Sequence, residues 1–158
     1  MVALGAKVKL TSPRGSRELP VEKFFVVPTG DDMRETAIHP DEIVTEILVP
    51  PSTHNATCEI RQRTVLDWPL ATASVALHMK GSTVSSASIV LGHVAPVPWR
   101  AAAAEKTIVG RSITPEVAEE VGKAASEGAN PLSGNGYKVQ LVRVAVKRAL
   151  LEAARGRA

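Results

Sequence analysis

The side chains that could carry out chemistry are few in this sequence, and they match no catalytic motif. The four histidines lack the close spacing of a metal site, and the single Cys58 can form neither an internal disulfide nor a cysteine-ligated iron–sulfur centre. The adjacent carboxylates Asp31–Asp32 and Asp41–Glu42 lie in polar segments, where neighbouring side chains usually point apart and share no proton. The residues alone therefore indicate no self-contained active site.

The composition is that of an ordinary globular domain. The 158 residues are 44% hydrophobic and 22% charged, which suffices for a sizeable core. No run of eighteen apolar residues occurs and the N-terminus carries lysines, so we expect a cytoplasmic protein without a signal peptide or membrane contact. The net charge of +3 and the 3% aromatic content make nucleic-acid binding through the basic residues between Tyr137 and Arg157 the weakest alternative.

The first fifty residues contain strands that need partners. Apolar and charged residues alternate from Ala6 to Ser12, which predicts a half-buried strand. A turn at Pro13–Ser16 and a returning strand from Arg17 to Leu19 would complete a hairpin, and a hairpin alone is marginally stable. This pattern indicates the end of a larger domain.

A second strand is expected just before the best domain boundary. His39 to Glu42 suits a single helical turn, because Pro40 fits its first position and two carboxylates face its N-terminus. The β-branched run from Ile43 to Val49 follows as a strand and ends at Pro50–Pro51. We therefore divide the chain into residues 1–50 and 51–158.

Residues 51–158 begin with strands and continue with helices. Thr57 to Arg63 is a plausible strand, and Thr72 to Lys80 with Val84 to Leu91 form an antiparallel hairpin around a turn at Gly81. Helices are expected from Trp99 to Val109, from the cap Thr114 to about Glu127, and from Tyr137 to Arg155. Strands followed by helices predict an α+β fold.

Several segments, in order along the chain, carry a resemblance to known proteins. They are Leu4–Leu10, Gly15–Pro20 with Phe24–Phe25, Pro40–Ile47 with Pro50, Arg63 and Asp67, Ile89–Pro96 with Pro98–Arg100, and Pro131–Lys138 with Val146–Leu150. Each segment is a weak signal alone, but together they cover nearly the whole chain. In this order they resemble one family, the FAD-binding (medium, flavoprotein) subunits of molybdenum hydroxylases such as xanthine dehydrogenase, aldehyde oxidoreductase and carbon monoxide dehydrogenase.

This resemblance implies a specific architecture and role. Residues 1–50 would be the C-terminal remnant of a vanillyl-alcohol-oxidase-type FAD-binding domain. Residues 51–158 would be the flavoprotein C-terminal domain, an antiparallel three-stranded sheet packed with a three-helix bundle. In the family, FAD passes electrons from the molybdenum and iron–sulfur subunits to an acceptor, and substrate hydroxylation occurs on the molybdenum subunit.

The resemblance also implies cofactor-binding residues. The candidates are Ile43, Val44 and Glu59. Val44 matches the position where a usually larger aliphatic residue flanks the isoalloxazine ring, and a valine in a strand core is an equally good interpretation of Val44. Glu59 matches a position that is commonly a lysine reaching the flavin, so the charge there is reversed. No catalytic residue and no metal ligand is expected in this chain.

The glycine-rich loops that hold the FAD pyrophosphate in the family have no equivalent in this sequence. We therefore expect a partial, truncated or split FAD-binding subunit that supplies one wall of the flavin site and contacts for electron transfer. Its partners would be a molybdenum-cofactor subunit and an iron–sulfur subunit, or an upstream FAD-binding fragment. The alternative is a non-catalytic assembly module that docks partner subunits without binding FAD.

Overall fold

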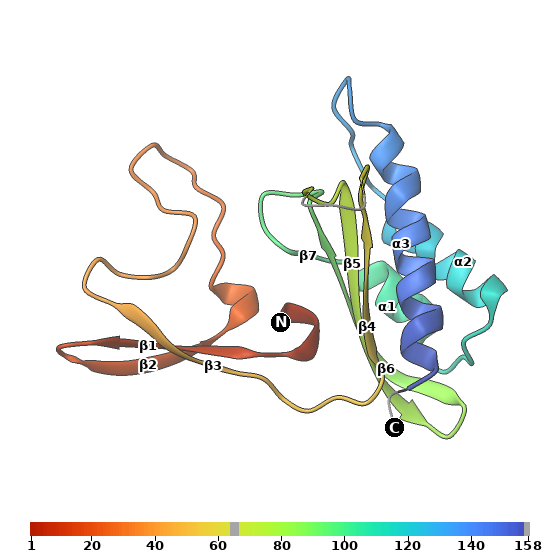
Figure 1. The fold of residues 1–158 in the computed structure, drawn as a ribbon, viewed down its shortest axis with the longest axis horizontal. Coiled ribbons are helices and arrows are strands. Elements are labelled where there is room, and N and C mark those ends of the chain that lie inside the picture. Colours follow the sequence, from red (N-terminus) through yellow and green to blue (C-terminus); the bar gives the residue numbers. More distant parts are fainter. Residues whose placement is uncertain (64–66, 157–158) are drawn as a thin grey trace.

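The computed structural model describes residues 1–63 and 67–156, and it has two antiparallel sheets with three helices (Figure 1). One sheet lies apart in the N-terminal third of the chain, and the other lies against the helices. The α+β fold predicted from the sequence is therefore confirmed. Arg157, the last basic residue of the weakest alternative, lies outside the described residues.

The N-terminal sheet has the strand order β2-β1-β3, with β1 in the centre. Its strands are β1 (Lys7–Ser12), β2 (Gly15–Pro20) and β3 (Ile43–Leu48), and two short 3-10 helices, η1 (Val2–Leu4) and η2 (Val21–Lys23), flank the hairpin. Val8 and Leu10 of β1 are buried with Ala6 and Val21. This core is small, and every residue of β3 is exposed.

The C-terminal sheet has the order β4-β5-β6-β7. Its strands are β4 (Asn55–Ile60), β5 (Ala71–Lys80), β6 (Thr83–Gly92) and β7 (Trp99–Arg100). Residues of β5 alternate between the two faces: Ala73, Val75 and Leu77 pack toward the helices, whereas Ala76 packs with Val90 and Ala3 of η1. The sheet therefore lies between the helices and the N-terminal segment.

The three helices cover one face of the C-terminal sheet (Figure 1). They are α1 (Ala102–Ile108), α2 (Pro115–Ala125) and α3 (Tyr137–Ala154). Ile108, Val121, Val146 and Leu150 are fully buried between the helices and the sheet. The α2 and α3 backbones approach closely at Gly122, where an added Cβ would lie 2.7 Å from the carbonyl oxygen of Arg143. Burial of these apolar faces stabilises the C-terminal domain.

Four details differ from the prediction. Residues 39–42 form a turn, in which the Glu42 N–H donates to the His39 carbonyl, and do not form a helical turn. Strand β4 ends at Ile60, before the expected Arg63. The segment expected to begin a helix at Trp99 is first a two-residue strand, because its backbone pairs with β6, and this strand makes the second sheet four-stranded.

Candidate functional site

A cavity of about 390 Å³ lies between the two sheets. Val44 and Ile47 of β3 line one side, and Thr72 and Ser74 of β5 line the other. The remaining lining residues are Met1, Val2, Ala3, Val8, Val21, Phe24, Phe25, Val90, Leu91, Gly92 and Pro98. None of these fifteen residues has a charged side chain, so the side chains around the cavity offer apolar surface with two hydroxyl groups.

A β-bulge in β3 places two apolar side chains on the same wall. Val44 pairs with Leu10, and Ile47 pairs with Val8, which lies two residues earlier in β1. Three residue steps along β3 therefore match two steps along β1. The extra residue is Thr45, whose hydroxyl hydrogen-bonds the hydroxyl of Thr11 at 3.1 Å. Because strand side chains alternate between faces, Val44 and Ile47 would point apart without this bulge.

The opposite wall depends on one glycine. Thr72 of β5 pairs with Gly92 of β6, and a Cβ at position 92 would overlap the hydroxyl oxygen of Thr72. The glycine therefore leaves room for the Thr72 side chain on the cavity side of the sheet. The neighbouring hydroxyl, that of Ser74, shares a hydrogen bond of 3.0 Å with Thr57 on β4.

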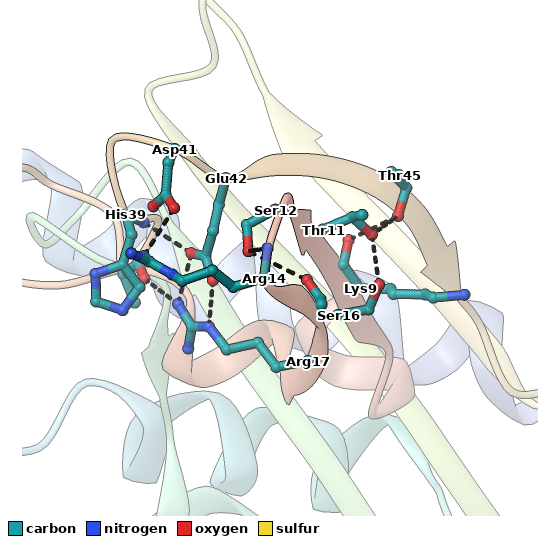
Figure 2. Close-up of polar contacts among 12 residues, drawn as sticks. Lys9, Thr11, Ser12, Arg14, Ser16, Arg17, His39, Asp41, Glu42 and Thr45 are labelled. Atoms are coloured by element: carbon teal, nitrogen blue, oxygen red, sulfur yellow. Dashed lines mark hydrogen bonds and ion pairs between the residues drawn. The ribbon is translucent and has the colours of Figure 1, made fainter.

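The start of β3 is held by a carboxylate–guanidinium pair (Figure 2). Arg17 Nε donates to Glu42 Oε1 at 2.6 Å, and Arg17 Nη2 donates to Glu42 Oε2 at 2.8 Å and to the Ala37 carbonyl at 2.8 Å. The His39 N–H donates to the same carboxylate at 2.8 Å. Hydrogen bonds from Arg17 and His39 lower the pKa of Glu42 from its usual 4.5 to about 2.

The predicted site residues fall at different places around this cavity. Val44 lines it, whereas Ile43 pairs with Thr11, on the face of the sheet away from Val44, and is not a lining residue. Glu59 pairs with Thr72 and so lies on the cavity side of the C-terminal sheet, one strand further out. The Glu59 carboxylate forms an ion pair with Arg61, which neutralises its charge locally.

Sequence reasoning missed Thr72, Ser74 and Gly92. The signal was present in the alternation of β5, because a strand whose odd-numbered residues face the helices must turn Thr72 and Ser74 the other way. Nothing in the sequence alone indicated that this second face would meet another sheet. This face of the C-terminal sheet lines a cavity only because the N-terminal sheet lies opposite it.

No group of three or more histidine, cysteine or acidic side chains within residues 1–63 and 67–156 is placed to hold a metal ion. Burial raises the pKa of the Cys58 thiol, which makes it a poor nucleophile. Among the helices described, none has the length and hydrophobicity needed to cross a membrane.

Two family models match the chain. The CO dehydrogenase flavoprotein C-terminal domain matches residues 56–153, and the FAD binding domain in molybdopterin dehydrogenase matches residues 1–52. The chain is also 33% identical to the carbon monoxide dehydrogenase medium chain of Afipia carboxidovorans, with all of this chain aligned to 55% of that protein. It is 28% identical to the glyceraldehyde dehydrogenase medium chain of Sulfolobus acidocaldarius, where 98% of this chain aligns with 55% of that protein.

Solved structures show the same fold. Carbon monoxide dehydrogenase from Hydrogenophaga pseudoflava superimposes with a TM-score of 0.83 at 33% identity, over 99% of this chain and 55% of that one. Quinoline 2-oxidoreductase from Pseudomonas putida 86 gives a TM-score of 0.83 at 27% identity, over 98% of this chain and 54% of that one. The chain thus spans about half the length of the relatives it matches. With a family model covering more than half of its residues, the chain belongs to the CO dehydrogenase flavoprotein C-terminal domain family, among the FAD-binding subunits of molybdenum hydroxylases.

Proposed function

We propose that this chain forms one wall of the FAD site in the flavoprotein subunit of a molybdenum hydroxylase. The observation that carries the proposal is the cavity between the two sheets, which is lined by no charged side chain and has Val44 on one side and Thr72 on the other. An isoalloxazine ring has flat apolar faces and a polar edge, and an apolar cavity with two hydroxyl groups matches both features. Bound FAD would accept and pass on electrons.

Each wall has a separate role in this proposal. The side chains of Val44 and Ile47 contact a face of the ring, and the hydroxyls of Thr72 and Ser74 offer hydrogen bonds to its edge. Val44 rather than Ile43 meets the ring, because the two residues point to opposite faces of β3. Glu59 lies further out and acts on the flavin only through the field of its pair with Arg61.

The proposal extends to the domains and partners. Residues 1–50 belong to the FAD-binding domain and residues 51–158 to the C-terminal domain. Electrons reach the flavin from an iron–sulfur subunit and a molybdenum-cofactor subunit, where the substrate is oxidised. An unpaired Cys58 suits the reducing cytoplasm, which is the compartment that we propose.

Titration of the purified chain with FAD, followed by flavin fluorescence, tests the proposal. The cavity accounts for the ring but for none of the phosphates, so we expect weak, saturable binding that lumiflavin, the ring system without its tail, reproduces. Thr72→Val and Ser74→Ala should each weaken it, because each removes one hydroxyl from the wall. No saturable binding of either flavin would favour the alternative, an assembly module without FAD.

A further inference from the structure

The N-terminal sheet and the C-terminal domain make few contacts with each other. Residues 49–54, which belong to neither sheet, connect them along the chain (Figure 1). Their apolar contact is a small cluster in which Ala3 of η1 packs with Ala76 and Val90. Among the residues that the structure describes, no backbone hydrogen bond joins the two parts. An interface this small permits movement of one part relative to the other.

One ion pair crosses between the two parts. Arg100 Nη1 of β7 lies 3.7 Å from Glu22 Oε2 of η2, and both side chains are 48% exposed. Every other ion pair of the described residues lies within the N-terminal part or within the C-terminal domain. The Glu22–Arg100 pair is therefore the electrostatic contact that depends on how the two parts are arranged.

The Arg100 end of this pair is fixed within the C-terminal domain. Arg100 Nε donates to both carboxylate oxygens of Glu105, at 2.9 and 3.1 Å. The Glu105 side chain is only 13% exposed, and its Oε1 also accepts the Ile89 N–H at 2.9 Å. The Ile89 carbonyl in turn accepts the Ala101 N–H. None of these bonds involves Glu22, so the guanidinium keeps its place when Glu22 moves away.

Both ends of the pair adjoin residues that line the cavity between the sheets. Val21 directly precedes Glu22, Phe24 follows it by two residues, and both line the cavity. Pro98, two residues before Arg100, lines the cavity from the C-terminal domain. The pair thus holds a lining segment of the N-terminal part beside a lining segment of the C-terminal domain.

We propose that the Glu22–Arg100 pair is a latch that holds the two parts closed around the cavity, and that they separate about residues 49–54 when it breaks. An exposed ion pair contributes little free energy, so the closed and open forms are close in stability and interconvert readily. Flavin contacts both walls only in the closed form, and its apparent affinity falls with the fraction of closed chain. The effect on flavin rests on the proposed function, whereas the movement itself does not.

Lumiflavin is the probe for the closed form, because it is uncharged and salt does not act on it through its own charge. Glu22→Gln should raise its dissociation constant about two- to fivefold at low ionic strength, the range expected for an exposed ion pair. Glu22→Lys, which repels Arg100, should raise it further. Both differences from the wild type should shrink at about 1 M salt, where the Debye length falls to about 3 Å.

Glu18→Gln is the matched control. Glu18 pairs with Lys7 at the same 3.7 Å, and the two side chains are 45% and 57% exposed, but the pair lies within the N-terminal sheet. Its loss should leave lumiflavin affinity unchanged. Equal affinities in Glu22→Gln and the wild type, equal losses in Glu22→Gln and Glu18→Gln, or differences from the wild type that persist at high salt would each overturn the latch.

Residual dipolar couplings of the free chain, aligned in a stretched neutral gel, test the movement without flavin. In the wild type, the amides of both sheets should fit one alignment tensor. In Glu22→Gln the two sheets should require tensors of different magnitude, and a single shared tensor in that variant would overturn the proposal. Failure of the wild-type chain to bind lumiflavin would contradict the proposed function instead, and the couplings would then decide the latch alone.

Discussion

Arg17 and Glu42 form a bidentate pair that connects the β1–β2 hairpin to the residue immediately before β3. The Glu42 side chain is only 8% exposed, and it also accepts the His39 N–H. Two parallel hydrogen bonds to a guanidinium fix the orientation of a carboxylate as well as its position. This pair therefore fixes where β3 begins and, with it, where Val44 meets the cavity.

The pair makes the stability of the chain depend on pH. The folded-state pKa of Glu42, about 2, lies below its usual 4.5, so its contribution is complete above pH 4.5 and is lost as the pH falls toward 2. In Glu42→Gln this contribution is absent at every pH. We expect the melting temperature of the variant to fall less steeply than that of the wild type between pH 4.5 and 2.

Asp41→Asn serves as the control for this experiment. Asp41 pairs with Arg14 at 2.7 Å, but the Arg14 side chain is 80% exposed, so solvent screens the interaction. The pH dependence of its melting temperature should match that of the wild type. Equal slopes for the wild type and Glu42→Gln would show that Arg17 does not hold Glu42 ionised.

The backbones of α2 and α3 pack closely against each other at Gly122. Alanine there would place a Cβ 2.7 Å from the Arg143 carbonyl oxygen, and neither backbone can withdraw without separating the helices. We expect Gly122→Ala to lower the free energy of unfolding by about 1–2 kcal/mol, despite the higher helix propensity of alanine. Gly30→Ala, in open space, should change it by no more than about 0.5 kcal/mol. Urea denaturation measures the free energy of unfolding of both variants. A Gly122→Ala variant with the same free energy of unfolding as the wild type would contradict this packing.

The N-cap of α2 is a separate source of stability. Thr114 Oγ1 accepts the N–H of Val117 at 3.2 Å. Thr114→Ala should cost about 1 kcal/mol of unfolding free energy, and Thr114→Ser should restore most of it, because serine keeps the accepting oxygen. An equal loss in both variants would attribute the effect to the lost methyl group instead of the cap.

Local patterns predicted most of the C-terminal domain. Alternation found β5 and β6 because one face of each strand is buried against helices, and Thr114–Pro115 marked the start of α2 because capping depends on neighbouring residues. The sequence predicts a helix from Trp99, whereas Trp99 pairs with Leu91 in the sheet, and this pairing is a tertiary contact. Such pairing overrides local preference and has no signal in a short window.

The cavity could be predicted only in part. The family resemblance placed Val44 at the flavin, but the bulge at Thr45 that turns Ile47 to the same wall depends on the register between β1 and β3. Thr72 lines the cavity only because its face of the C-terminal sheet lies opposite the N-terminal sheet. Register and the meeting of two sheets are long-range properties, and a single sequence does not display them.

The most direct test compares tryptophan at two adjacent positions of β3. Val44→Trp should fill the cavity, whereas Ile43→Trp points to the opposite face and leaves it open. The measurement is an NMR titration of the labelled chain with lumiflavin, following the amide signals of Thr72, Ser74 and Gly92. We predict saturable shifts at these amides in the wild type and in Ile43→Trp, and none in Val44→Trp. Equal shifts in both variants, or no shifts in the wild type, would contradict a flavin site between the two sheets.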